Sequence, residues 1–528
     1  MQNQHNKIDF KNEKGAFVQS LFFCMLTFFL ILSNLLSISL RAIYMKKEQK
    51  LFMWAALISA FIWSVAPLLR QSLPMDTQEA IVWGKYCLWG TTKHPPFSGW
   101  LSYGFYRLLG QTDFSMYLLS QICVLLGLYG IYKLAKYFLS ETQAVLATAF
   151  QLGIIFYHFS ATEFNVNVVS LAIWPWCTYF FWRAYINDKL KDWLLFGVLM
   201  GVNILNKYVG GVLGIAFGVF VLMTPKAQKL FKNPKAYLSV LICFIVCLPH
   251  LLWLHETDFG VLNYIATRNP TGKITSFLKH FVYPLKFMAA QVLFVLPALI
   301  TFYVLASKQR KIEFQKDTET SRFLLCIGII PTLFWVVKSA LWGTPLKDMW
   351  NFPSLFVWGI LFFYFIRREW NNQKAKQFIK AVFVWSMVFA FIYAGQCVLT
   401  KSVRFQSNCR QITRDLIERY EQKTHQKIHY VGGNIWFSDM ISLYAEQEVK
   451  PMIWLNPKAN PWFDEKDFNL NGALVVAENK AEYDSYKEQF KNNLTKAEQM
   501  DIIYQNRFGK TKTLPVYWGV YKGEKNEK

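Results

Sequence analysis

The sequence is poor in acidic residues and lacks the motifs by which soluble enzymes bind nucleotides or zinc. It has 34 Asp and Glu against 57 Lys and Arg, which gives a formal net charge of +23. It contains no glycine-rich nucleotide-binding loop and no cysteine spacing typical of zinc sites. The basic residues are spread along several loops instead of forming one stripe, so nucleic acid is not an expected partner.

Long apolar runs dominate the chain. Of its 528 residues, 53% are hydrophobic and 18% aromatic, more than a soluble core requires. Runs near the bilayer length of about 20 residues predict an α-helical polytopic membrane protein with about 11–12 transmembrane helices. We place helices at about 16–40, 51–69, 114–139, 144–161, 165–185, 193–206, 208–223, 236–254, 281–305, 321–341, 350–366 and 377–397. Asn203, Asn206 and Lys207 interrupt the pair at 193–223 and could mark a turn at the membrane surface.

The distribution of Lys and Arg predicts the orientation in the membrane, because cytoplasmic loops hold an excess of them. Three basic loops are expected inside: 225–235, 307–322 and 367–376. The segments then expected outside are 70–113, 255–280, 342–349 and the C-terminal tail. The positive charge therefore reflects topology and contact with anionic membrane lipids.

The chain divides into three predicted domains. Residues 1–44 are an N-terminal extension with one apolar helix, and residues 45–400 are a transmembrane domain whose first outer loop is 70–113. At about residue 401 the composition turns polar, so we assign 401–528 to a separate soluble domain of ordinary size. Met45, which precedes a basic stretch, is an equally good candidate for the native start.

The polar tail shows the alternation expected of a small α/β domain with a partly parallel sheet. Strand-like runs at 428–431, 452–455, 473–476 and 516–520 alternate with helical patterns near 402–423, 435–446 and 480–492. Gly432-Gly433-Asn434 stands between a strand and a helix, where an anion can bind a helix start. The alternative is that these glycines only make the turn.

The first outer loop carries the strongest candidates for chemistry. Asp76 and Glu79 are three residues apart and would share a helix face beside apolar residues. A carboxylate in such a half-desolvated cleft can act as a general base. Alternatively, Asp76 caps the helix and Glu79 completes the capping pattern. His94, followed by two prolines that fix an extended turn, could bind a sugar or phosphate, orient a carboxylate, or be structural.

Basic residues near the outer helix ends suggest an anionic ligand. An ionisable group at membrane depth costs about 2.5–3.5 kcal/mol, so it usually snorkels or serves a site. Lys286 and Lys338 fit either role, as does Lys347 in a loop. Lys207, between two short apolar segments and next to Tyr208, is harder to explain by snorkelling, and a lipid-linked phosphate would supply its partner.

Several motifs together resemble the membrane glycosyltransferases of the GT-C fold, of the protein O-mannosyltransferase and aminoarabinose (lipid A) transferase type, similar to glycosyltransferase family 39. The motifs are Asp76-Thr77-Gln78-Glu79-Ala80, His94-Pro95-Pro96-Phe97, Trp100-Leu101, Phe164-Asn165-Val166-Asn167, Asn206-Lys207-Tyr208, and Pro249-His250-Leu251-Leu252-Trp253-Leu254 followed by Asp258-Phe259 and Tyr264. The resemblance covers most of the chain from about Met45 onward.

This resemblance implies transfer of a hexosyl or pentosyl group from a polyprenyl (undecaprenyl) phosphate to lipid A or another envelope glycolipid. The reaction would take place at the outer face of the bacterial inner membrane, with the C-terminal domain in the periplasm. Asp76 is then the candidate base, with Glu79 or His94 as its neighbour, although Thr77 and Gln78 separate two acids that are adjacent in parts of the family.

The same resemblance assigns the candidate substrate-binding residues. Lys207 and Tyr208 would bind the phosphate, with Lys286 and Lys338 next in line. Asn165 and Asn167 would read sugar hydroxyls or cap an outer helix end. No cofactor is required, and a divalent metal near Asp76 is possible but lacks diagnostic ligand spacing.

Two alternatives remain open. A protein O-glycosyltransferase of the same fold would act on Ser or Thr; only the absence of an inserted β-trefoil-like domain argues against it. A non-catalytic transporter of lipids or solutes is the other. Against it, the sequence shows no inverted repeat and no matching pair of broken helices, and the large polar outer loop suits an enzyme better.

Overall fold

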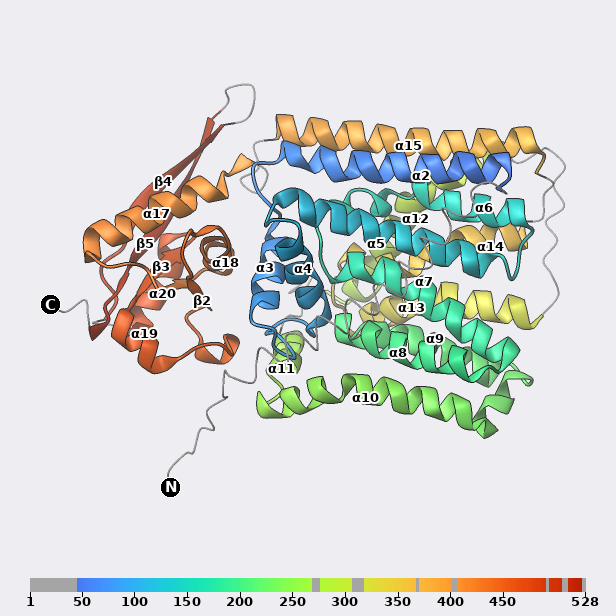
Figure 1. Cartoon of the computed structure of the whole chain (residues 1–528), viewed down its shortest axis with the longest axis horizontal. Coiled ribbons are helices and arrows are strands. Elements are labelled where there is room, and N and C mark those ends of the chain that lie inside the picture. Colours follow the sequence, from blue (N-terminus) through green and yellow to red (C-terminus); the bar gives the residue numbers. More distant parts are fainter. Residues whose placement is uncertain are drawn as a thin grey trace.

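The computed structural model describes residues 45–267, 276–305, 318–366, 370–400, 406–490, 493–505 and 511–524. The predicted helix at 16–40, with the rest of the 1–44 extension, lies outside this part of the chain. The described residues form a bundle of long helices with a smaller α/β unit at one end, here called the C-terminal region (406–524) (Figure 1).

Six helices in the described part of the chain are long and apolar enough to cross a membrane, and the chain is a multi-pass membrane protein. They are α2 (Lys47–Val65), α5 (Asp113–Ala135), α10 (Pro234–Glu256), α12 (Lys279–Leu305), α13 (Glu319–Trp342) and α15 (Asn372–Leu399). The bent pair Glu141–Gly153 and Ile155–Thr162, whose halves differ in direction by 78°, would make a seventh span. Its first half begins with α6 (Glu141–Ala149).

Several of the other predicted helices are short or broken in the structure. The turn at Lys207 separates α8 (Leu190–Asn206) from α9 (Gly210–Met223). The run near 350–366 becomes η8 (Phe352–Val357) and α14 (Trp358–Phe365). The bundle also contains α7 (Val166–Asn187). Apolar composition therefore locates these helices correctly.

Close packing in the bundle holds α7 against α5, α9 and α13. The ring of Phe181 on α7 stacks on Phe217 of α9 at 4.2 Å and faces Phe323 of α13 at 6.0 Å. A Cβ on Gly127 of α5 would lie 2.3 Å from the carbonyl oxygen of Leu171, so only glycine allows α5 and α7 to approach this closely.

The first outer loop forms two short helices, α3 (Met75–Lys85) and α4 (Phe97–Leu108), which lie across the end of the bundle (Figure 1). A Cβ on Gly84 would lie 2.0 Å from the backbone oxygen of Gly99, so the two helices pack backbone to backbone. The short α11 (Gly260–Thr267) lies at the same end. These outer helices separate the long helices from the C-terminal region.

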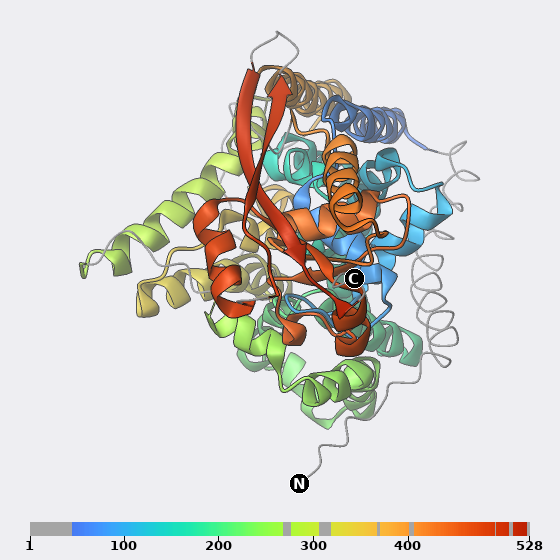
Figure 2. The ribbon, with the colours of Figure 1, turned by 90° about the vertical axis from the view of Figure 1, so that its left-hand side faces the viewer.

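The C-terminal region is a five-stranded mixed sheet with helices, and its sheet lies over the end of the bundle when viewed from that end (Figure 2). Its strands are β1 (Tyr430–Gly433), β2 (Lys450–Ile453), β3 (Ala473–Ala477), β4 (Glu498–Gln505) and β5 (Thr511–Tyr521), in the order β2-β1-β3-β5-β4. β1 is parallel to β2 and β3, and β5 is antiparallel to β3 and β4. The helices are α17 (Cys409–Thr424), α18 (Ile435–Tyr444), α19 (Glu465–Asn471) and α20 (Lys480–Phe490).

The partly parallel sheet confirms the α/β prediction, but β4 was not predicted. β4 is an edge strand with polar residues at its start, so its composition gives little strand signal. At the glycine turn, Gly433 has a φ of +106°, and Asn434 caps α18 by accepting from the Trp436 amide at 3.1 Å. The Asn434 amide donates to Glu482, so this turn already holds a carboxylate and the turn-forming interpretation fits best.

Candidate active site

Asp76 lies in the first turn of α3, half-buried. The N-cap of this helix is Pro74, so the interpretation that Asp76 caps the helix is wrong. Its carboxylate instead stands near the helix N-terminus, where the helix dipole favours negative charge. The neighbouring Thr77 hydroxyl donates to the carbonyl of Phe164 at 3.2 Å. This bond joins α3 to the segment that begins α7.

Lys207 follows the last residue of α8, in the turn before α9 and outside the candidate spans. Its ammonium donates to the side-chain oxygen of Asn167 at 2.7 Å. Burial lowers the pKa of Lys207 to about 8; the Asp76 carboxylate opposes this shift and the Lys347 ammonium adds to it. The side chains of Asp76, Asn167, Lys207 and Lys347, from separate segments, therefore influence one another at the end of the bundle that carries α3.

The two asparagines have different roles. Asn165 is the N-cap of α7, and its side-chain oxygen accepts from the Asn167 amide at 2.9 Å, as the capping alternative predicted. Asn167 uses its side-chain oxygen for Lys207 and points its amide nitrogen at the Met349 sulfur, 3.5 Å away. Asn167 is thus part of the cluster, and Asn165 orients the backbone that carries it.

Tyr208 contacts a histidine that the sequence showed only as part of a motif, without a role. The Tyr208 hydroxyl lies 2.7 Å from Nε2 of His250 on α10, and Nδ1 of His250 lies 2.5 Å from the carbonyl oxygen of Trp89. Because a carbonyl only accepts, Nδ1 carries the proton in neutral His250 and Nε2 accepts from Tyr208. His250 thereby joins the Lys207 turn to the outer loop.

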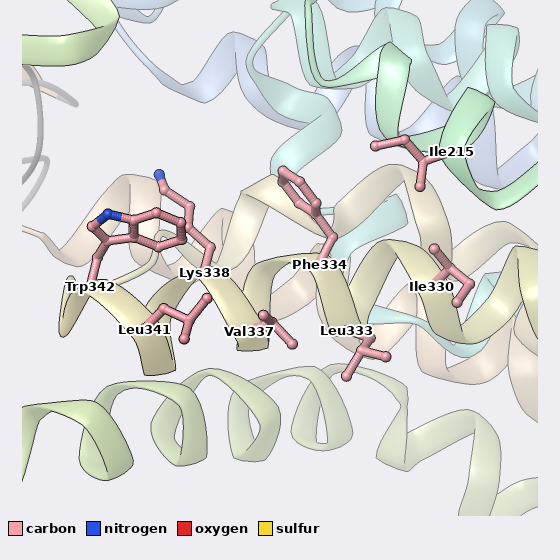
Figure 3. A pocket seen from close by; sticks show the side chains of 8 residues that line it. All are labelled: Ile215, Ile330, Leu333, Phe334, Val337, Lys338, Leu341 and Trp342. Carbon is pink, nitrogen blue, oxygen red and sulfur yellow. The ribbon is translucent and has the colours of Figure 1, made fainter. Parts of the chain in front are cut away.

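Lys338 lies one turn before the outer end of α13, beside an apolar groove of about 590 Å³. Its ammonium lies 5.6 Å and 5.3 Å from the ring centroids of Trp335 and Trp350. In Figure 3, Lys338 and Trp342 lie at one end of the groove, with Ile215 of α9 at the other. Lys286 is exposed on α12 and is not among the residues that line this groove.

The segment 343–351 links the groove to Lys207. It carries Trp350, which faces Lys338, and Met349, which contacts Asn167. Its conformation is fixed by Asn351, whose side-chain amide donates to the Gln291 side-chain oxygen at 3.2 Å and to the Thr332 hydroxyl of α13 at 3.0 Å. A chain of contacts therefore runs from the apolar groove to the cluster around Lys207.

Glu79 and His94 have other surroundings. Glu79 is buried in an ion pair with Lys93 and faces Asp439 of the C-terminal region. The His94 ring packs edge-on against Trp83 at 6.0 Å. The partner Lys93 was adjacent to His94 in the sequence, but nothing marked Asp439, which lies 360 residues beyond Glu79. In the described ranges no three His, Cys, Asp or Glu side chains lie close enough to hold a metal ion.

Comparison with known proteins identifies similar chains. Residues 93–253 match the family model described as dolichyl-phosphate-mannose-protein mannosyltransferase. Lipopolysaccharide core galacturonosyltransferases RgtB and RgtA of Rhizobium johnstonii (strain DSM 114642 / LMG 32736 / 3841) are both 22% identical, over 322 and 216 residues. These matches cover 59% and 39% of this chain. They cover 64% of RgtB and 43% of RgtA, less than two thirds of either relative.

Solved structures show the same architecture. ArnT from Cupriavidus metallidurans bound to undecaprenyl phosphate matches with a TM-score of 0.59 and 13% identity, over 90% of this chain and 98% of that chain. Its apo state gives the same TM-score at 14% identity. The chain therefore has the ArnT-like fold, and its residues 93–253 match the dolichyl-phosphate-mannose-protein mannosyltransferase model, which confirms the GT-C resemblance.

Proposed function

We propose that the chain is a glycosyltransferase that moves a sugar from a polyprenyl phosphate to lipid A or another envelope glycolipid. The observation that carries the proposal is the cluster of Asp76, Asn167 and Lys207 at the outer end of the bundle. A base and a phosphate-binding cation are the two groups that such a transfer needs. The comparisons support this class of reaction, since both curated relatives are named as sugar transferases of lipopolysaccharide.

The donor would lie along the segment 343–351, with its polyprenyl chain in the groove on α13 and its phosphate at Lys207. The groove is lined almost entirely by apolar side chains, which suit an isoprenoid, and Lys338 stands where a headgroup would emerge. Lys347 adds positive charge near Lys207. The ArnT structure bound to undecaprenyl phosphate supports a lipid phosphate as ligand of this fold.

The proposed reaction needs no cofactor. Asp76 takes the proton of an acceptor hydroxyl, whose oxygen attacks the anomeric carbon of the donor sugar. The bond between that carbon and the phosphate oxygen breaks, and the polyprenyl phosphate leaves as an anion. Lys207 meets the charge that develops on this oxygen, and a fixed cation in a partly dehydrated site lowers the barrier. Asn167 holds the Lys207 ammonium in place for this step.

The positive-inside distribution supports a bacterial inner-membrane protein with Asp76 and the C-terminal region on the periplasmic side. Membrane lipids then surround the bundle, and the acceptor reaches the site from the outer leaflet. A second candidate is transfer to Ser or Thr of a protein. The description of the matching family, a protein mannosyltransferase, favours it.

Mass spectrometry of lipid A, the remaining lipopolysaccharide and envelope proteins tests the proposal. Cells without this gene would be complemented by wild type, Asp76→Asn or Asp484→Asn. Asp484 is an exposed acid of α20 that lies outside the motifs of the resemblance, which makes it a suitable control. We expect a sugar-sized mass to be lost from a glycolipid and restored by wild type and Asp484→Asn only. Loss confined to glycopeptides would indicate the second candidate, and no change in any glycan would reject both.

A further inference from the structure

The C-terminal region is fastened to the first outer loop by many specific contacts. Helix α18 packs on α3, and the Tyr444 hydroxyl of α18 accepts from the Leu73 backbone amide at 3.3 Å. The rings of Tyr86 and Trp462 stack at 4.3 Å. Arg410 of α17 pairs with Asp113 at 2.8 Å. We call this arrangement, with α18 seated on α3, the docked state.

A cluster of three charged residues is buried in this interface. Glu79, Lys93 and Asp439 are 4%, 6% and 1% exposed. Glu79 pairs with Lys93, whose ammonium also lies 5.8 Å from the ring centroid of Trp454 in the C-terminal region. Neither carboxylate oxygen of Asp439 has a hydrogen-bond partner among the described residues. The cluster therefore has two carboxyl groups and one cation.

Charge balance decides which group carries a proton. Two ionised carboxylates with one ammonium would bury a net negative charge, which is costly. Glu79 is in direct contact with Lys93, and Asp439 is not. Burial raises the pKa of Asp439 well above its ordinary value, the Glu79 carboxylate raises it further, and Lys93 opposes the shift. Asp439 is thus the group that takes up the proton.

We propose that Asp439 is a positioning residue, a neutral carboxylic acid that seats the C-terminal region on the Glu79–Lys93 pair and so holds the helix that carries Asp76. Asp76 lies one turn before Glu79 on α3, so a shift of α3 at this interface would move the base relative to Lys207. The link to transfer rests on the proposed function. The docking itself is measurable without any transfer assay.

The other charged groups at this interface have their own partners. Lys85 at the end of α3 pairs with Glu448 at 3.3 Å, and Arg410 pairs with Asp113. Lys450 of β2, a strand packed against α18, pairs with Asp467 at 2.9 Å. Tyr86, next to Asp439, is neutral at ordinary pH because burial raises the pKa of its hydroxyl. Of the described acids named here, Asp439 alone has no partner for either carboxylate oxygen, so its protonation is the one that we link to docking.

The sign of the pH dependence follows from linkage. Docked Asp439 keeps its proton, whereas undocked Asp439 in water loses it above the ordinary pKa of 3.8. Docking therefore takes up one proton, and its equilibrium constant falls about tenfold per pH unit between 3.8 and the raised docked value. An Asp439→Asn variant has the same shape without a titrating proton, so it lacks this dependence.

Hydrogen exchange of the full chain in lipid nanodiscs tests the proposal. The amides of α3 and α18 are followed over a pH series and corrected for intrinsic exchange. We expect wild-type protection, relative to Asp439→Asn, to fall about tenfold per pH unit as pH rises through this range. Asp484→Asn, an exposed acid of α20, should behave as wild type. Equal pH dependence in wild type and Asp439→Asn would overturn the proposal.

A further variant keeps the test decisive if Asp439→Asn folds poorly. In Glu79→Gln, Asp439 can ionise as the partner of Lys93, so the dependence should disappear. The same slope in wild type and Glu79→Gln would show that this cluster does not control docking.

Transfer provides the link to the reaction. With the acceptor saturating, the ratio of the Asp439→Asn rate to the wild-type rate should increase with pH, because the variant stays docked. A pH-independent ratio, together with the expected exchange result, would separate docking from positioning of Asp76. Failure of transfer in every chain would bear on the proposed function alone.

Discussion

Replacing Lys207 with methionine tests the phosphate site most directly. Methionine keeps much of the length of the side chain and removes the charge. A hydrogen bond to a charged group contributes about 1.5–3 kcal/mol, so the Kd for undecaprenyl phosphate should rise about ten- to 150-fold. We expect the rise in Kd to lie in the upper part of this range, because the Lys207 ammonium is held by Asn167 and is already partly dehydrated.

The assay is binding of undecaprenyl phosphate to purified protein in nanodiscs, followed by native mass spectrometry or tryptophan fluorescence. Lys232→Met is the matched control, since Lys232 is an exposed lysine of a predicted inner loop. Lys207→Arg should recover part of the affinity because it restores the charge. An unchanged Kd in Lys207→Met, with a folded protein, would refute the assignment and direct attention to Lys338.

Three further predictions follow from the same geometry. Because the pKa of Lys207 is lowered to about 8, its charge is present below that pH and lost above it. The kcat/KM for the donor should therefore fall above about pH 8, and a pH-independent kcat/KM would contradict this. Tyr208→Phe removes the hydroxyl that donates to His250 Nε2, and thermal unfolding should show a free energy of unfolding lower by about 1–3 kcal/mol. If Tyr208→Phe costs the same free energy in a His250→Gln background, the contact does not contribute. Val337→Trp fills the groove and should weaken binding of undecaprenyl phosphate while sparing a short-chain isoprenyl phosphate; equal effects on both would place the lipid chain elsewhere.

The sequence predicted the fold class and singled out Asp76, Asn167 and Lys207 of the cluster around Lys207, because these depend on local signals. Lys207 was notable as a cation between two apolar segments, and the structure places it in a turn. For Asn165 the sequence left two roles open, sugar recognition and helix capping, and the structure shows the N-cap of α7. Hydropathy does not report where a helix bends, so the break between Gly153 and Ile155 was not predicted.

Contacts between distant segments could not be predicted. Asp76 and Glu79 were expected to act together because they are three residues apart, but Glu79 pairs with Lys93 and faces the C-terminal region. Which way each carboxylate points depends on what packs against α3 from either side. His250 was missed for the same reason, since its partners Tyr208 and Trp89 lie 42 and 161 residues away.

These long-range contacts bear on how the two halves of the proposed reaction are kept in register. Transfer requires the acceptor base and the donor phosphate to be held within a fraction of an ångström of the productive geometry. The bond from Thr77 to Phe164 ties the base helix to the start of α7, which carries Asn167. The bridge through His250 ties the Lys207 turn to the outer loop. Asp76 and Lys207 are therefore connected through two independent routes, and loss of either route should lower kcat more than it weakens donor binding.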